Sequence, residues 1–252
     1  MRVLVLGGTT EASALAKLLA GDARIDAILS LAGRTNTPRP QPLVTRVGGF
    51  GGVEGLVRWL GDERIEAVID ATHPYAAQMS AHAVAACTRT GVALGSLVRP
   101  PWRRQEGDSW RSVPSADAAA LALGKTPLRV FLSLGRQELH AFTAAPQHRY
   151  VARTIEAPDR AALPPNIRVV QARGPFDRDA EARLLSDEEI DIIVSKNSGG
   201  EATYAKIEAA RELELPVVMI ERPDKPAGHV LKSPEEAVAW LHDRAPGSRR
   251  GV

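Results

Sequence analysis

Short apolar runs rich in valine, isoleucine and leucine alternate with amphipathic stretches along almost the whole chain. In the first half, four such runs predict strands: RVLVL (2–6), AILSL (27–31), AVIDA (67–71) and ALGSL (93–97). The amphipathic stretches between them predict helices over about residues 10–20, 52–61 and 75–90. This alternation indicates an α/β fold with a mainly parallel sheet.

The second half of the chain repeats this scheme. Its apolar runs predict strands at RVFLSL (129–134), RYVART (149–154), IRVVQA (167–172), DIIVS (191–195) and PVVMI (216–220). Helices are expected at RQELHAF (136–142), near 177–187, over 200–213 and from Pro234. The simplest account is two similar α/β lobes, residues 1–125 and 126–246, followed by a flexible polar tail at 247–252.

One stretch, VRPPWRRQEGDSW (98–110), interrupts the alternation with prolines, charges and two tryptophans. This composition is typical of a connection, or of a loop that faces a site, rather than of a core element. We expect a domain change nearby.

Composition narrows the classes of function. The chain has 252 residues, 44% of them apolar, which is enough for a substantial core, and its 32 basic and 30 acidic residues lack the charge imbalance of a nucleic-acid binder. The single cysteine, Cys87, excludes an internal disulfide, and no Cys/His cluster indicates a metal site, so we interpret Cys87 as a buried thiol on a helix. No apolar run approaches the roughly 20 residues that span a bilayer, and the first residues, MRVLVLGG, predict a strand, so we expect no secretion signal. We expect a cytoplasmic protein with no membrane partner.

A glycine turn stands between the first predicted strand and the first predicted helix, in LVLGGTTEASALAKLL (4–19). Gly7 and Gly8 allow the backbone close to a ligand, while Thr9, Thr10 and the helix N-terminus offer donors to a phosphate. The pattern predicts a nucleotide site. Because the full G-x-G-x-x-G fingerprint is absent, an ordinary strand-to-helix turn remains the alternative.

Arg34 and Thr35, in LAGRTN (31–36), follow the second predicted strand. NAD-binding folds place an acidic side chain there for the ribose hydroxyls, whereas NADP-binding folds place an arginine. Asp26 lies at the beginning of that strand, so no carboxylate stands at its end. Together with the glycine turn, Arg34 favours NADP over NAD.

A second glycine-rich stretch, RVGGFGG (46–52), precedes the next predicted helix. Four glycines around Phe50 suggest a loop pressed against a flat ligand. A flexible surface loop is the alternative.

Polar residues crowd the end of the third predicted strand in AVIDATHPYAAQM (67–79). Ligands of open α/β sheets lie beyond the carboxyl ends of the strands, so Asp70, Thr72, His73 and Tyr75 are expected to face a cofactor or substrate. Pro74 is placed to start the following helix and to fix how the imidazole leaves the strand.

The second half contains a comparable strand, polar glycine turn and helix in IIVSKNSGGEATYAK (192–206). Residues 195–200 combine hydroxyl, ammonium, amide and backbone donors, an array that suits carboxylates or phosphates. A solvated turn is the alternative.

Taken together, the chain resembles the precorrin-6A reductase family of cobalamin biosynthesis from about residue 2 to residue 242. The resemblance rests on the motifs GGTTEA, AGRT, RVGGFGG, DATHPYA, GRQEL, RGPF and SKNSGGEATYAK. It implies a two-lobed Rossmann-like fold with the active-site cleft between the lobes, and NADPH-dependent reduction of one carbon–carbon double bond of precorrin-6A to its dihydro form. The polar tail after Arg244 lies outside it.

The resemblance also implies roles for particular residues. Cofactor contacts are expected at Gly8, Thr9, Thr10, Arg34 and Thr35, with Gly49 and Phe50 close by. The residues expected to line the cleft are His73, Tyr75, Lys196, Asn197 and Ser198, together with Gly199 and Arg136 on the substrate side. His73 and Tyr75 are the candidates for donating or orienting a proton. Other enzymes of the same pathway are the expected protein partners.

The chemistry of the residues fits such a substrate, because a tetrapyrrole with many acetate and propionate groups needs dispersed basic contacts. Basic residues in or beside the motif loops are Arg99, Arg103, Arg104, Arg136, Arg153, Arg173 and Lys196. Hydride transfer requires mainly that the nicotinamide be held against the acceptor carbon.

Alternatives from other classes stay open. A short-chain-type carbonyl reductase would need a Tyr-x-x-x-Lys pair, but Tyr75 is followed at that spacing by Met79 and Tyr204 by Glu208. A non-catalytic nucleotide- or tetrapyrrole-binding module, and a cobalt-containing form of the substrate, are both compatible with these residues.

Overall fold

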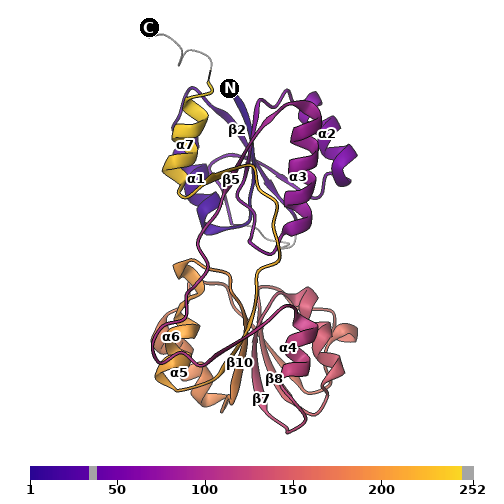
Figure 1. Ribbon diagram of the computed structural model, residues 1–252, viewed down its shortest axis with the longest axis vertical. Helices are drawn as coiled ribbons and strands as arrows, with labels where there is room; N and C mark the ends of the chain where they lie inside the picture. The colour runs from indigo at the N-terminus through magenta and orange to yellow at the C-terminus, as the bar shows by residue number, and fades with distance from the viewer. Residues whose placement is uncertain (34–38, 246–252) are drawn as a thin grey trace. The chain divides into compact units, whose positions relative to one another are not determined.

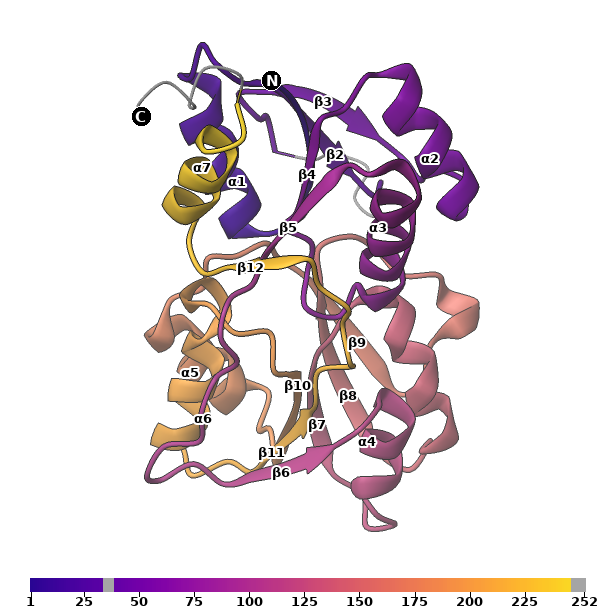
Figure 2. The same ribbon diagram turned by 45° about the horizontal axis from the view of Figure 1, so that its top comes forward.

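The computed structural model describes residues 1–33 and 39–245 of the chain, which forms two compact units (Figures 1 and 2). The first unit contains Met1–Arg99 and the segment from Pro223 onward, and the second contains Pro100–Arg222. This division differs from the expected boundary at residues 125 and 126. The second unit begins within the proline-rich stretch that interrupts the alternation. After the last strand of the second unit, the chain returns to the first unit.

The first unit contains a sheet whose strands are all parallel. Its described strands are β1 (Arg2–Leu6), β2 (Asp26–Leu31), β3 (Val44–Val47), β4 (Ala67–Asp70), β5 (Ala93–Leu97) and β12 (His229–Leu231). Their spatial order is β12-β5-β4-β1-β2-β3. Counting β12 as the sixth strand, this is the 3-2-1-4-5-6 order of dinucleotide-binding folds. Figure 2 shows β12 beside β5, where the returned segment completes the sheet.

Helices cover both faces of this sheet: α1 (Thr10–Ala20) and α7 (Pro234–His242) lie on one face, and α2 (Gly52–Asp62) and α3 (Ala77–Thr90) on the other (Figure 1). The central strand β1 serves both layers because successive side chains of a strand point to opposite faces. Val3 and Val5 pack in the cluster that contains Leu15 of α1, whereas Leu4 and Leu6 pack in the cluster that contains Leu56 of α2. Burial on both faces explains why residues 3–6 of β1 form an unbroken apolar run.

The second unit contains a parallel sheet with the same strand order. Its strands are β6 (Trp110–Val113), β7 (Arg129–Ser133), β8 (Arg149–Thr154), β9 (Ile167–Gln171), β10 (Ile192–Lys196) and β11 (Val217–Ile220). In space they run β6-β11-β10-β7-β8-β9. In this sheet β6 takes the place of the sixth strand of the 3-2-1-4-5-6 order, although it is the first strand of the second unit along the chain.

The second unit contains 3₁₀ segments as well as α-helices. The α-helices are α4 (Ala116–Ala122), α5 (Arg178–Asp187) and α6 (Ala205–Glu212), with 3₁₀ segments η1 (Arg136–Ala144), η2 (Arg160–Ala162) and η3 (Glu201–Thr203). Helices α5 and α6 lie on one face of the sheet and α4 on the other (Figure 1). The expected helix at 136–142 is thus a 3₁₀ helix, and the one expected over 200–213 is η3 followed by α6.

The expected strands agree with the structure to within two residues at each end. The strands β3, β6 and β12 and the helix α4 lack a counterpart among the expected elements. β3 and β12 are short edge strands with exposed residues such as Val44 and Val230, so they lack the long apolar run that marks a central strand.

Candidate functional site

Each sheet has a switch point at its centre, where neighbouring strands lead to helices on opposite faces. In the first unit, β1 leads to α1 and its neighbour β4 leads to α3. In the second unit, the corresponding neighbours are β7 and β10. Ligands of open α/β sheets bind outside the carboxyl ends of the strands at such points. The motifs GGTTEA, DATHPYA, GRQEL and SKNSGGEATYAK lie at or just beyond the carboxyl ends of these four strands.

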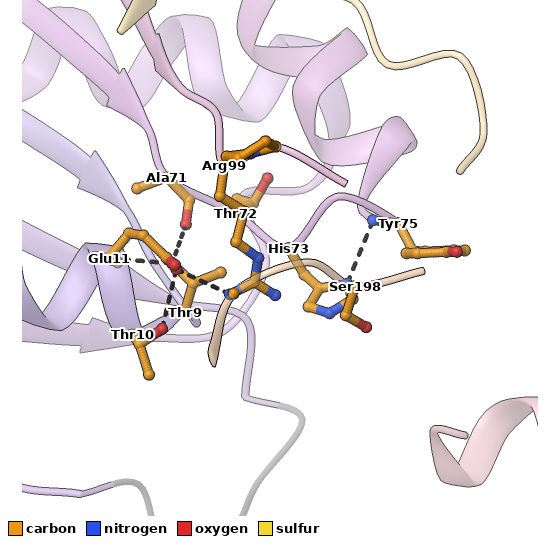
Figure 3. Close-up of polar contacts among 12 residues, drawn as sticks. Thr9, Thr10, Glu11, Ala71, Thr72, His73, Tyr75, Arg99 and Ser198 are labelled. Carbon is orange, nitrogen blue, oxygen red and sulfur yellow. Dashed lines mark hydrogen bonds and ion pairs between the residues drawn. The ribbon is translucent and has the colours of Figure 1, made fainter. Parts of the chain in front are cut away.

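The glycine turn after β1 places backbone and helix N-terminus at this edge (Figure 3). Gly7 is packed, because a Cβ there would lie 2.7 Å from Leu29 Cδ1. Gly8 has φ +119°, and no heavy atom lies within 4 Å of the position a Cβ would take. The turn therefore leaves open space directly over its backbone, beside a helix N-terminus that favours anions. This arrangement fits the phosphates of a dinucleotide cofactor.

Thr9 links the two turns of the switch point. As N-cap of α1, its Oγ1 accepts a hydrogen bond from Ala12 N–H at 3.1 Å, and the same hydroxyl donates to Ala71 O, after β4, at 2.9 Å (Figure 3). Because its single hydrogen is donated to Ala71 O, the Thr9 hydroxyl shapes the turn. A hydrogen bond donated by Thr9 to a cofactor phosphate would come from its backbone.

The first turn of α1 carries a neutralised carboxylate. Arg99 Nη1 donates to Glu11 Oε2 at 2.9 Å, and Thr10 Oγ1 lies 3.1 Å from the same oxygen (Figure 3). Without a cation beside it, Glu11 would repel an anionic ligand at this helix end. Arg99, which the sequence suggested as a substrate contact, here compensates the charge of Glu11.

Arg34 and Thr35, the expected contacts for the 2′-phosphate, lie outside the described residues. The described residues that directly follow β2 are Ala32 and Gly33, neither of which carries a carboxylate. The expectation that this position favours NADP remains a prediction.

The glycine-rich stretch after β3 wraps around a side chain of its own, Arg46. The guanidinium carbon lies 3.9 Å from the centre of the Phe50 ring, Nη1 donates to Ser30 Oγ at 2.8 Å and Gly48 O at 2.9 Å, and Nη2 donates to Gly49 O at 3.0 Å. Burial lowers the pKa of Arg46. Arg46, a residue of the motif to which the sequence assigned no role, therefore packs against the Phe50 ring, and the contact of Phe50 with a flat ligand stays a prediction.

Asp70, at the end of β4, was expected to face a ligand, and this is wrong. It is 1% exposed, and its Oδ1 accepts from Thr72 N–H at 3.0 Å and from Thr72 Oγ1 at 2.6 Å. Its Oδ2 accepts from Ser80 Oγ of α3 at 2.5 Å and lies 3.5 Å from Lys225 Nζ. A buried carboxylate is destabilised unless it has such partners. These contacts hold Asp70 in place, and it anchors the turn that follows β4.

His73 and Tyr75 lie on that turn and are both partly buried (Figure 3). Their rings are 5.6 Å apart, and Tyr75 N–H donates to His73 Nδ1 at 3.3 Å. With Nδ1 as acceptor, a neutral imidazole carries its proton on Nε2. Pro74 does not start the helix as expected. It lies within a turn closed by Ala76 N–H and His73 O at 2.8 Å, and α3 begins at Ala77.

The cationic residues at the edge of the second sheet have carboxylate partners. Lys196, the last residue of β10, is paired with Glu138, whose Oε2 also accepts from Gly135 N–H at 2.9 Å. Arg136 Nη1 lies 3.2 Å from Glu156 Oε2. Arg153 is buried, paired with Glu181 and stacked 3.6 Å over the Phe176 ring, which makes it a core residue rather than a substrate contact.

The loop after β10 is shaped by Asn197. Its Oδ1 accepts from Trp102 N–H at 2.8 Å and its Nδ2 donates to Trp102 O at 3.0 Å. Trp102 Nε1 in turn donates to Gly200 O at 2.9 Å. The Asn197 amide therefore ties the loop to the segment that enters the second unit. Ser198 and Gly199 follow in this loop, where Gly199 has φ +65°.

Among residues 1–33 and 39–245, no group of three or more His, Cys, Asp or Glu side chains is placed to hold a metal ion. The same described residues contain no helix with the length and apolar character of a membrane span.

Comparisons with known proteins agree with the fold and motifs. The family model described as "Precorrin-6x reductase CbiJ/CobK" matches residues 2–242. The chain is 52% identical over 251 residues to the precorrin-6A reductase of Rhodobacter capsulatus, covering 100% of this chain and 99% of that protein. It is 30% identical over 237 residues to the cobalt-precorrin-6A reductase of Salmonella typhimurium, covering 88% and 87%. A solved structure described as "CobK precorrin-6A reductase" matches at a TM-score of 0.92 with 52% sequence identity, over 100% of both chains.

Proposed function

The chain belongs to the precorrin-6x reductase family, and from this premise we propose that it catalyses the NADPH-dependent reduction of one carbon–carbon double bond of precorrin-6A. The product is the dihydro form of this tetrapyrrole, an intermediate of cobalamin biosynthesis. On this proposal the enzyme works in the cytoplasm and receives its substrate from other enzymes of the pathway.

The observation that carries the cofactor assignment is the open turn at the first switch point. Gly8, with φ +119° and open space at its Cβ position, lets a phosphate approach the backbone at the start of α1. Glu11, the nearest carboxylate in the helix, is neutralised by Arg99 at 2.9 Å. When bound, NADPH supplies the hydride, and the residues of the turn hold and orient it. The choice of NADPH over NADH rests on Arg34.

The substrate assignment rests on the edge of the second sheet. Lys196 is the last residue of β10 and Arg136 is the first residue of η1, which follows β7; β7 and β10 are the two strands at the switch point. Each is paired with a glutamate, Lys196 with Glu138 and Arg136 with Glu156. Substrate carboxylates are expected to compete with these glutamates for the same cations, which makes binding charge-assisted and dependent on ionic strength.

His73 and Tyr75 are our candidates for managing the proton that accompanies reduction. His73 can donate from Nε2 because its Nδ1 accepts from the backbone of Tyr75. Both residues follow β4, whose end the buried Asp70 holds through hydrogen bonds to Thr72 and Ser80.

Relatives of this chain are named for a metal-free and for a cobalt-containing form of the substrate. The metal-free form is favoured because the chain is 52% and 42% identical to precorrin-6A reductases from Rhodobacter capsulatus and Rhodococcus erythropolis, against 30% for the cobalt-precorrin-6A reductase of Salmonella typhimurium.

The decisive experiment is a steady-state assay of the purified full chain under anaerobic conditions. Loss of NADPH absorbance that requires precorrin-6A, together with a dihydro product identified by mass spectrometry, is the expected result. Parallel reactions with NADH and with cobalt-precorrin-6A rank the cofactors and the substrates. Binding of NADPH without turnover of either tetrapyrrole would contradict the proposal and support a non-catalytic binding module.

A further inference from the structure

Two basic residues flank the point where the chain leaves the second unit. Arg222 is the last residue of that unit, and Lys225 lies in the segment that begins at Pro223 and belongs to the first unit. Neither residue belongs to a strand or helix. Each contacts a loop at the carboxyl edge of the sheet in its own unit.

Lys225 holds the turn that follows β4. Its Nζ lies 3.1 Å from Thr72 Oγ1, 3.3 Å from Thr72 O and 3.5 Å from Asp70 Oδ2. The C=O and N–H of a trans peptide point in opposite directions, so the bond to Thr72 O also sets the direction of the His73 N–H. Lys225 thereby supplies both the counter-charge of the buried Asp70 and the orientation of the chain as it enters His73.

Arg222 holds the loop that follows β10. Its Nε donates to Asn197 O at 2.8 Å, and its Nη2 donates to Ser198 O at 3.0 Å and to Pro100 O at 3.1 Å. A Cβ at Gly199 would lie 2.2 Å from Pro100 O and 2.4 Å from Arg222 Nη2, so only glycine fits over the guanidinium. Since the Ser198 carbonyl points to Arg222, the Gly199 N–H points away from it.

We infer that Arg222 and Lys225 are positioning residues for the proposed reduction. Lys225 orients the His73 turn through Thr72, and Arg222 shapes the loop of Asn197 to Gly199. The reductase role of these loops rests on the proposed function, whereas their dependence on Arg222 and Lys225 follows from the contacts alone. Arg222 and Lys225 thus lie three positions apart on one connecting segment. Lys225 positions the turn of the candidate proton donor in one unit, and Arg222 positions the candidate substrate loop in the other.

The test compares Lys225→Gln and Arg222→Gln with Lys232→Gln, an exposed lysine of the same returned segment. Hydrogen–deuterium exchange is measured on peptides that cover residues 71–76 and 197–200. Lys225→Gln should accelerate exchange at 71–76 and Arg222→Gln at 197–200, while Lys232→Gln changes neither. This readout needs neither cofactor nor substrate, so it separates the inference from the proposed function.

Kinetics with NADPH and precorrin-6A then test the consequence. Lys225→Gln should lower kcat by about 10- to 100-fold, because small displacements of a reacting group have effects of this size. The dissociation constant of NADPH should change much less, and Lys225→Arg should recover part of kcat because it keeps the charge and the donors. Arg222→Gln should act mainly on KM for precorrin-6A.

Three results would overturn the inference. The first is unchanged exchange at 71–76 in Lys225→Gln. The second is exchange in this variant that rises evenly over the whole first unit. The third is a kcat of this variant that falls only in proportion to its folded fraction. If Lys225→Gln does not fold, the double variant Asp70→Asn/Lys225→Gln removes the buried charge together with its partner, and the same exchange and kcat criteria apply to it. Failure of the wild-type chain to reduce precorrin-6A would contradict the proposed function instead.

Discussion

Substituting Gly8 by alanine gives the sharpest test of the cofactor site. Gly8 has φ +119°, a conformation that alanine rarely adopts, but an added Cβ would meet no protein atom within 4 Å. The substitution therefore has two separate effects. One is backbone strain, which lowers stability, and the other is a methyl group that occupies the space over the turn.

The structure sets the size of each effect. Strained backbone at a non-glycine residue costs roughly 1–3 kcal/mol, so the free energy of unfolding should fall by that amount. The methyl group would displace a phosphate from the backbone donors at the start of α1, and losing one charge-assisted hydrogen bond costs roughly 1.5–3 kcal/mol. This corresponds to NADPH binding that is weaker by about 10- to 100-fold.

Gly91 provides a matched control for the strain. It is the C-cap of α3, has φ +73°, and likewise has no heavy atom within 4 Å of the position that an added Cβ would take. It lies just before β5, at the amino edge of the sheet and thus at the opposite edge from Gly8. Gly91→Ala should destabilise the protein comparably and leave NADPH binding unchanged.

The assay measures the dissociation constant of NADPH by fluorescence titration and the free energy of unfolding by urea denaturation, for both variants and the wild type. A selective loss of affinity in Gly8→Ala is the expected result. If both variants lose NADPH affinity equally, or if Gly8→Ala binds NADPH like the wild type, the glycine turn is not the phosphate site.

Three further predictions concern other parts of the chain. Arg34→Ala should lower kcat/KM for NADPH by roughly 10- to 100-fold and barely change it for NADH, because only NADPH carries the 2′-phosphate that a guanidinium binds. Equal losses would remove this role. Asn197→Ala should raise KM for precorrin-6A with little effect on NADPH binding, because it releases the Trp102 backbone from the loop. A loss confined to NADPH would place the loop at the cofactor instead. Hydrogen bonds from the His242 ring and the Arg24 backbone lower the pKa of Asp22 from 3.8 to about 2. The stabilisation from Asp22 should be complete above its unfolded pKa and disappear as the pH falls through its folded pKa. The free energies of unfolding of the wild type and Asp22→Asn should therefore differ at neutral pH and converge in acid. A difference that stays constant with pH would contradict the assignment.

The central strands and the turns after them could be predicted from local sequence. β1, β4, β7 and β10 are buried between helix layers, which requires continuous apolar runs that are visible in the sequence. The turns at their ends combine glycine, threonine, serine and asparagine, the residues that backbone geometry and helix capping require there. Because the carboxyl ends of parallel strands share one edge of a sheet, the sequence also predicted that such turns gather at a site.

Only the tertiary structure decided which distant segments complete each unit. β12 pairs with β5 although the whole second unit separates them in sequence, and β6 pairs with β11 although it is the first strand of the second unit and β11 the last. Lys225 contacts Thr72 across 153 positions of sequence. Short edge strands and a single lysine in a proline-containing segment have no periodic pattern. Their partners are set by which backbone edges and buried charges the central strands leave to be satisfied, and that depends on the whole fold.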